Sequence, residues 1–179
     1  QKELRAFLED DFQPVFSIFE NDARQGYAAA RWRIDADIDI PLRTLSPSDF
    51  GFHNALAMDD GTIKFIDFEY FGWDDPVRLV ADFLLHPGMR LDRDLKQTFA
   101  DKMAEIFSGD GNFRERFSLL YPLVGLRWVL IILNEFLPEQ RQRRQFAEAT
   151  DPVKAQVRQL TKAGELLERL GNEGAGKYY

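Results

Sequence analysis

The chain has 179 residues, which is enough for one domain with a substantial core, and its 16 phenylalanines and 3 tryptophans supply bulky apolar side chains. A formal net charge of −7 argues against a nucleic acid partner, because proteins that bind nucleic acids normally present a basic face. The absence of cysteine excludes disulfides and thiolate metal sites. We therefore expect a single domain over residues 1–179.

The N-terminal region is predicted to be mainly helical. Residues 2–8 and 14–32 have apolar positions at helical spacing. Residues 33–39 alternate isoleucine and alanine with charged residues, a pattern that fits either an edge strand or an extended connector.

A short β-hairpin is predicted next. Two apolar runs, residues 55–58 and 62–66, flank an Asp-Asp-Gly turn signal. Because both strands advance by the same rise per residue, this turn places residue 54 opposite residue 66 or 67. Asn54 and Asp67 are therefore expected to lie side by side at the open end of the hairpin.

Asp49 is expected to complete a set of three oxygen-bearing side chains. It lies five positions before Asn54 on a glycine-containing loop that can fold back toward the hairpin. Phosphoryl transfer needs a group that takes the proton of the attacking hydroxyl, and Mg²⁺ held by hard oxygen ligands. Asp49 suits the first role, and Asn54 and Asp67 suit the second. The spacing from Asp49 to Asn54 is also that of the base and metal ligand in kinase catalytic loops.

At these residues the chain resembles the aminoglycoside phosphotransferase and choline kinase group of small-molecule kinases, which share the protein-kinase-like fold. The family stretch H-G-D-x-H-x-x-N corresponds here to Ser46-Pro47-Ser48-Asp49 through Asn54. The stretch I-D-W/F-E corresponds to Ile66-Asp67-Phe68-Glu69-Tyr70, and G-x-x-D-P corresponds to Gly72-Trp73-Asp74-Asp75-Pro76. The resemblance implies that Asp49 is the catalytic base, that Asn54 and Asp67 bind Mg²⁺, and that ATP is the phosphoryl donor.

The resemblance implies an α+β, mostly helical fold: a protein-kinase-like C-terminal lobe with a small catalytic β-hairpin and no N-terminal lobe. The first glycine is Gly26, so no glycine-rich loop precedes the catalytic segment, and Lys2 is the only lysine before Lys64. We therefore expect the chain to be a fragment that, alone, binds nucleotide weakly and is inactive.

Three positions depart from the family pattern. Pro47 stands two residues before the base and Gly51 two residues after it, where the family has histidines, and Leu79 replaces a carboxylate early in the next helix. Pro47 can support the loop by fixing its own φ at about −65°. Asp82, about one turn beyond Leu79, is a candidate substitute for the lost carboxylate.

Other interpretations of these residues stay open. Asp49 and Asn54 also suit capping within a loop, since both residue types bond their own backbone readily. Asp67 ends an apolar strand, so we expect it to be buried and to need a metal or a base as compensation. Asp74 or Asp75 is expected to cap the following helix.

Five further polar residues near these motifs have candidate roles. Glu69, Asp74 and Asp75 are candidates for contacting substrate or orienting the loop. His53 is expected to pack or to form a hydrogen bond. His86 is expected to be a helix-end residue and nothing more.

The rest of the chain is predicted to be helical, over residues 76–85, 92–107, 113–136, 139–149 and 151–170. A glycine-rich break precedes residue 113, and Pro122 is expected to kink or divide a helix. The glycine-rich residues 171–179 are expected to form a disordered tail.

These features predict an ATP- and Mg²⁺-dependent phosphotransferase that acts on a hydroxyl of a small molecule, an aminoglycoside-like or choline-like compound or a sugar alcohol. The acidic net charge is compatible with a cationic substrate. The alternatives are a catalytically silent kinase-like binding module and an unrelated helical interaction domain.

A cytoplasmic location follows from the need for ATP. No membrane association is expected, because the apolar run 128–133 is far too short to span a bilayer. Substrate identity and oligomeric state are not determined by the sequence.

Overall fold

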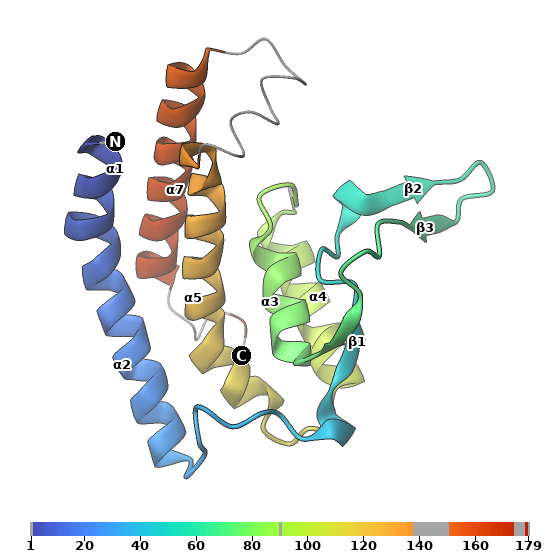
Figure 1. Ribbon diagram of the computed structural model, residues 1–179. Helices are drawn as coiled ribbons and strands as arrows, with labels where there is room; N and C mark the ends of the chain where they lie inside the picture. The colour runs from blue at the N-terminus through green and yellow to red at the C-terminus, as the bar shows by residue number, and fades with distance from the viewer. Residues whose placement is uncertain (1, 90, 138–150, 174–177, 179) are drawn as a thin grey trace.

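The computed structural model describes residues 2–89, 91–137, 151–173 and 178. The fold is α+β and mostly helical, with two small antiparallel sheets of two strands each. Long helices stand side by side in one part of the molecule, and a strand-containing arm projects from the other part (Figure 1).

The N-terminal region is one continuous helical stretch. It comprises α1 (Lys2–Ala6), a π-helical turn η1 (Phe7–Phe12) and α2 (Gln13–Ala29). Residues 9–13, which lie between the two predicted helical stretches, are helical as well. The widened π-helical turn ends two residues before Pro14, which has no backbone N–H to donate, and it buries Phe7 and Phe12. Residues 33–39 form an irregular connector, one of the two alternatives.

The predicted hairpin is confirmed, with the expected register. Strands β2 (Ala55–Ala57) and β3 (Ile63–Phe65) pair antiparallel, with residue 55 opposite residue 65. Beyond the ladder, the Ile66 N–H donates to the Asn54 carbonyl at 2.9 Å. Gly61 in the turn has a φ of 81°, a conformation that glycine adopts without steric cost.

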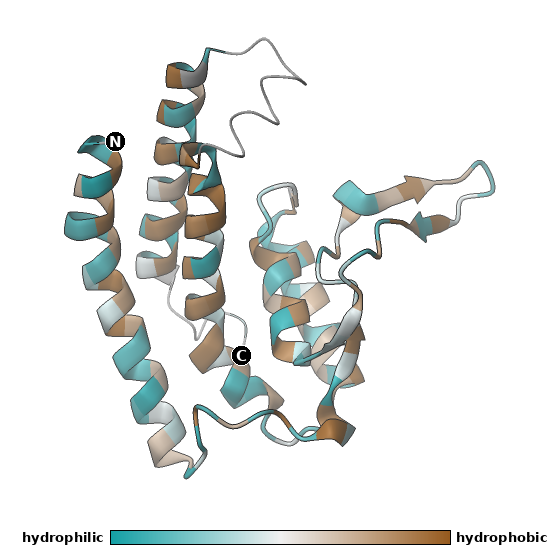
Figure 2. Ribbon diagram, viewed as in Figure 1, coloured by the Kyte–Doolittle hydropathy of each residue, from teal (hydrophilic) through white to brown (hydrophobic). Residues whose placement is uncertain are grey.

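A second sheet, which the sequence did not predict, ties the two ends of this region together. Strand β1 (Thr44–Ser46) pairs antiparallel with β4 (Gly72–Asp74). The segment from β1 to β4, here called the arm, carries many exposed apolar side chains. Parts of its ribbon are brown, the colour of hydrophobic residues, in Figure 2. They are Leu45, Phe52, Leu56, Met58, Ile63, Ile66, Phe68, Tyr70, Phe71 and Trp73.

The helices after the arm agree closely with the predicted ones. They are α3 (Pro76–Leu85), α4 (Arg93–Ile106), α5 (Phe113–Ile132) with a following 3₁₀ turn η4 (Leu133–Phe136), and α7 (Pro152–Glu173). Pro122 lies inside α5 and does not divide it. The helix expected over residues 139–149 falls outside the described residues.

The core lies around α5, which packs against α2, α3 and α7. Phe117 and Val129 of α5 and Val77 and Val80 of α3 are fully buried. Gly125 lets α7 approach closely, because a Cβ at that position would lie 2.4 Å from a methyl carbon of Leu170.

The core helix α5 has a second property. The stretch Phe113–Phe136 is long and apolar enough to cross a membrane by length and composition. The run 128–133, which we judged too short to span a bilayer, therefore belongs to a longer apolar helix. The expected absence of a membrane partner and the expected cytoplasmic location stay predictions.

The C-terminal residues correct a further expectation. Residues 171–173 continue α7 rather than forming a tail, and Tyr178 is buried. The Tyr178 ring packs edge-on against Phe117 and Tyr121, with ring centroids 6.2 and 5.5 Å apart. Residues 174–177 and 179 lie outside the described residues.

Candidate active site

The loop that carries Asp49 is a tight turn held by serine side chains. The Oγ of Ser46, a buried residue, accepts a hydrogen bond from the Ser48 N–H at 3.1 Å. Ser48 has a left-handed φ of 65°, and its hydroxyl donates to the Tyr70 carbonyl at 2.9 Å. The Pro47 carbonyl accepts from the Asp49 N–H at 2.8 Å. Serine hydroxyls from both sides of Pro47 therefore support the loop.

The Asp49 carboxylate is anchored through both oxygens. Asn54 donates from Nδ2 to Oδ2 at 3.2 Å and to the Asp49 backbone carbonyl at 3.0 Å. His53 Nε2 lies 2.9 Å from Oδ1. The Asp49 side chain is 45% exposed, so it is oriented and still accessible. Because Asn54 uses its amide nitrogen here, its Oδ1 is left to face another partner.

His86, at the end of α3, joins the same cluster, although we expected no such role for it. Its ring stacks on His53 with centroids 3.8 Å apart and planes 6° from parallel, and Trp128 packs edge-on against it at 4.7 Å. His86 Nε2 lies 3.6 Å from Asp49 Oδ1. Gly51 leaves room for the cluster, because a Cβ there would lie 2.6 Å from the His53 ring.

The hydrogen bonding of His86 defines its tautomer. The Gly88 N–H donates to His86 Nδ1 at 3.0 Å, so neutral His86 carries its proton on Nε2, the nitrogen nearest Asp49. Burial lowers the pKa of His86, which favours this neutral form.

This tautomer bears on metal binding. Ligand atoms of Asp49, His53 and His86 lie within 4.8 Å of one another. However, a histidine that binds a metal through one nitrogen normally donates a hydrogen bond from the other, and His86 Nδ1 accepts one. The cluster therefore fits hydrogen-bond donors arranged around a carboxylate better than a metal centre.

Asp67 lies apart from this cluster of contacts. It lies two residues after β3, is exposed, and has a left-handed φ of 64°. The expected burial of Asp67 was wrong, because the arm projects away from the core. The structure therefore brings together Asp49 and Asn54 of the predicted site. Within the described part of the chain, neither Asp67 nor Glu69 forms a hydrogen bond or an ion pair.

Asp74 and Asp75 have structural partners at the start of α3. Asp75 caps the helix by accepting from the Val77 N–H at 2.8 Å, which confirms the predicted cap. Asp74 accepts from the Asp75 N–H at 2.8 Å and pairs with Arg78 at 2.9 Å. These contacts orient the beginning of α3.

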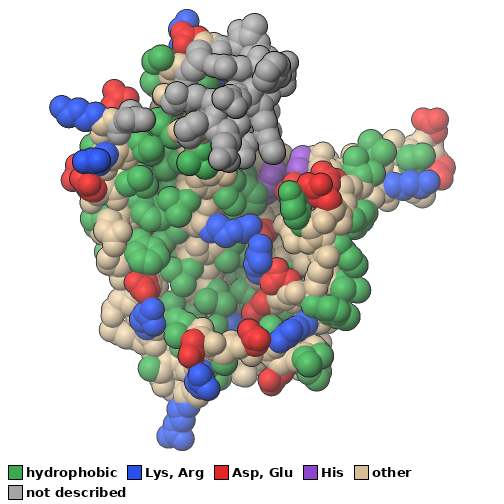
Figure 3. All heavy atoms as spheres, viewed as in Figure 1, with side chains coloured by type: hydrophobic (Ala, Val, Ile, Leu, Met, Phe, Trp, Pro, Cys, Tyr) green, Lys and Arg blue, Asp and Glu red, His purple; other side chains and the backbone are tan. Residues whose placement is uncertain are grey.

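A pocket of about 550 Å³ opens beside Asp49. It is lined by Ser48, Asp49, Tyr70, Arg78, His86, Arg127, Trp128 and Ile131. Figure 3 shows histidine side chains (purple) and basic side chains (blue) in the hollow between the helices and the arm. Asp49 thus faces a space large enough for a small molecule.

Asp82 lies beneath this pocket and does not line it. Its carboxylate accepts from Arg127 Nη1 and from Trp128 Nε1, both at 2.8 Å, and Arg78 Nε lies 3.5 Å away. Burial raises the pKa of Asp82, although the neighbouring arginines oppose that rise. The proposed substitute for the lost helix carboxylate therefore holds pocket side chains in place.

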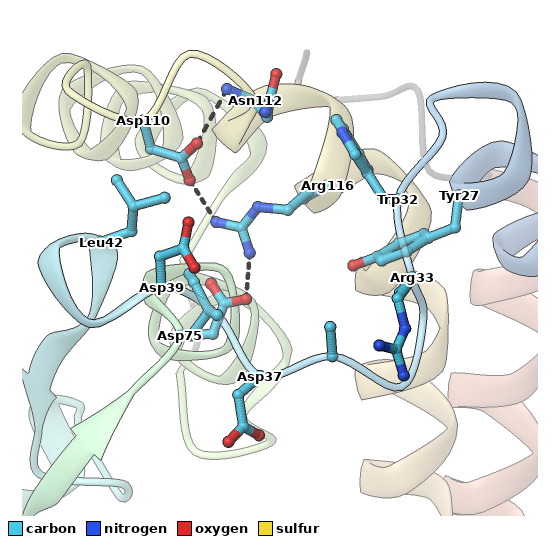
Figure 4. A pocket seen from close by; sticks show the side chains of 12 residues that line it. Tyr27, Trp32, Arg33, Asp37, Asp39, Leu42, Asp75, Asp110, Asn112 and Arg116 are labelled. Atoms are coloured by element: carbon cyan, nitrogen blue, oxygen red, sulfur yellow. Dashed lines mark hydrogen bonds and ion pairs between the residues drawn. The ribbon is translucent and has the colours of Figure 1, made fainter.

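A second pocket, of about 270 Å³, lies between the connector after α2 and the starts of α3 and α5. Figure 4 shows the Arg116 guanidinium between Asp75 and Asp110, with which it forms ion pairs. Tyr27 and Trp32 pack edge-on at 5.5 Å on the opposite side, and burial raises the pKa of Tyr27. Sequence patterns did not indicate this pocket, because four separate segments form it.

No protein-family model, curated protein or solved structure matches this chain.

Proposed function

We propose that the chain forms the catalytic and substrate-binding part of a kinase-like phosphotransferase that moves a phosphoryl group from ATP to a hydroxyl of a small molecule. The observation that carries the proposal is the Asp49 carboxylate, which Asn54 and His53 orient at the wall of a pocket. A catalytic base needs this combination of fixed orientation and access to substrate.

Asp49 has the role of accepting the proton of the attacking hydroxyl. Its two oxygens already receive hydrogen bonds on one side, so the exposed part of the carboxylate faces the acceptor. His86, in its Nε2–H tautomer and stacked on His53, holds this arrangement and is a positioning residue.

The donor set also fits Mg²⁺, which prefers carboxylate and amide oxygens. Asn54 Oδ1 remains available because Nδ2 binds Asp49, and Asp67 offers an exposed carboxylate one residue beyond the backbone pairing of Ile66 with Asn54. Asp67 keeps a left-handed backbone that is uncommon outside glycine, and such conformations cluster at functional sites. A bound Mg²⁺ supplies charge neutralisation for the phosphates of ATP.

The test is Mg²⁺-dependent transfer from ATP to a panel of hydroxyl compounds, with full-length protein. We expect Asp49→Asn to lower kcat by roughly 10²- to 10⁴-fold while leaving the melting temperature unchanged, because the base is lost and the exposed site is kept. Asp59→Asn, on the turn of the same arm, is the matched control and should retain activity. Near-normal turnover by Asp49→Asn would refute the assignment.

A catalytically silent binding module is the second candidate. It is favoured by one observation: within the described residues, Asp67 forms no hydrogen bond or ion pair with Asp49 or Asn54. This candidate predicts ligand binding in the pocket without transfer of phosphate to any member of the panel.

A further inference from the structure

The pocket beside Asp49 has a wall formed by two arginines. Arg78 comes from α3 and Arg127 from α5, and both line the pocket together with Asp49. Their side chains are 42% and 43% exposed. Two helices that meet in the core thus place two permanent positive charges at one small space.

Both guanidinium groups are held in place from behind. Arg127 Nη1 donates to Asp82 at 2.8 Å, and Arg78 pairs with Asp74 through Nη1 at 2.9 Å. Arg127 also lies over the Trp128 ring, 5.9 Å from its centroid. Within the described residues, Nη2 of neither arginine donates a hydrogen bond. A pre-oriented guanidinium with remaining donors suits planar anions such as carboxylate and phosphate.

The buried carboxylate of Asp82 does not need both Arg78 and Arg127 as counter-charges. Asp82 keeps only 7% of its side chain exposed, and Arg127 and Trp128 already saturate its Oδ1, whereas Arg78 lies at the longer distance of 3.5 Å from Oδ2. The acid is therefore covered by protein, while the two arginines face the pocket.

We propose that this pocket binds a hydroxyl compound that carries an anionic group, a carboxylate or a phosphate, with the anion on Arg78 and Arg127 and the hydroxyl toward Asp49. The role of Asp49 rests on the proposed function. Anion binding by Arg78 and Arg127 is independent of that function. A cationic amine, which the net charge of the chain had suggested, would meet two guanidinium groups of like charge at this wall of the pocket.

The experiment uses three pyranoses of different charge: neutral glucose, cationic glucosamine and anionic glucuronate, with inorganic phosphate as the minimal anion. Each is titrated into the isotope-labelled chain without ATP, and the Nε–H signals of Arg78 and Arg127 are followed by NMR. We expect saturable shifts with glucuronate and phosphate and none with glucosamine.

Matched variants define the site. Arg78→Gln and Arg127→Gln should each weaken glucuronate binding by roughly 10- to 100-fold, the range for one lost hydrogen bond to a charged group. Arg24→Gln, which removes an exposed ion pair with Glu20 on α2, should bind as the wild type does. Melting curves accompany each variant; if Arg127→Gln unfolds because it uncovers Asp82, Arg78→Gln and Arg127→Lys carry the test.

The outcomes separate this inference from the proposed function. Anion binding that depends on Arg78 without any transfer from ATP would keep the inference and refute the phosphotransferase. Transfer of phosphate to acceptors without anion binding at Arg78 would keep the phosphotransferase and refute the inference. The inference is overturned if glucosamine binds in preference to glucuronate, if neither anion shifts the two arginine signals, or if Arg24→Gln weakens binding as much as Arg78→Gln does.

Discussion

The helical body and the arm use apolar residues in opposite ways. The body buries them: Phe117 of α5 is 0% exposed and Phe113 is 2% exposed. The arm displays them: Trp73 of β4 is 66% exposed and Leu56 of β2 is 51% exposed. Large apolar side chains therefore stabilise the fold in the body, whereas the exposed ones of the arm contribute little to it.

The candidate site lies where these regions meet, and its residues divide accordingly. His86 and the two pocket arginines are held by helices of the body, while Asp67 sits on the arm with an exposed side chain. The Asp49 carboxylate is oriented by His53 and Asn54 of the arm together with His86 of the body, whereas the Asp67 carboxylate is exposed on the arm.

The largest expected effect tests this contrast directly. Phe117→Ala should lower the free energy of unfolding by about 3–5 kcal/mol, because it opens a cavity among aromatic neighbours in the core. Trp73→Ala should change it by less than about 0.5 kcal/mol, since the ring lies mostly in solvent. Urea denaturation of both variants measures the difference, and equal effects would break the comparison.

The next effect concerns charged groups. Arg116→Gln should cost about 3 kcal/mol, because it leaves the buried carboxylate of Asp110 and the cap Asp75 without their cation. Arg24→Gln removes an exposed pair and should cost less than about 1 kcal/mol. The same denaturation series checks this, and a mild Arg116→Gln variant would show that the network is not structural.

Much of the fold was predictable because its signals are local. Asp75 before Pro76 marked the start of α3, and the Asp-Asp-Gly turn set the hairpin register. The β1–β4 sheet gave no usable signal, because two three-residue strands separated by the whole arm have no detectable pattern. The continuity of the first helix depends on a π-helical turn and on core burial, which local propensity does not reveal.

The site was predictable only in part. Asp49 and Asn54 were found through their spacing, and the structure joins them. His86 and Arg127 were missed because they come from distant helices, and only tertiary packing brings them to Asp49. Asp67 was proposed as a metal ligand because of its sequence motif. Its exposure could not be predicted, because it depends on the direction in which the arm projects.

A smaller effect is expected at the start of α4. The Asp92 carboxylate accepts from the Leu95 N–H at 2.9 Å and caps the helix. Asp92→Ala should cost about 1 kcal/mol. Asp94→Ala, which removes a side chain that forms no cap, is the control, and an equal loss in both variants would contradict the capping role.

On the arm, Asp67→Gly should leave stability unchanged or raise it by up to about 1 kcal/mol, because glycine adopts the left-handed conformation without steric cost. Any Mg²⁺-dependent property should be lost in the same variant. Thermal melting provides the readout, and a clear destabilisation would show that the Asp67 side chain supports the fold.

The smallest expected effect is a pH dependence at His86. Its pKa lies below the ordinary value of 6.5 because it is buried, so the unfolded chain binds the proton more readily. His86 should therefore reduce stability as the pH falls below about 6.5 and have no such effect above it. NMR titration of the two histidines, assigned with His53→Gln, should show a depressed pKa and an Nε2–H tautomer for His86. An Nδ1–H tautomer would contradict the positioning role.

The most direct test of the central claim is to locate the metal. Mn²⁺ replaces Mg²⁺ at oxygen ligands and broadens nearby NMR signals, so weak binding suffices in the presence of ATP. We predict broadening centred on Asn54 and Asp67, abolished by Asp67→Asn and retained by Asp59→Asn. Broadening centred on the turn of the arm would contradict the phosphotransferase site. So would broadening centred on His53 and His86 that persists in the Asp67→Asn variant.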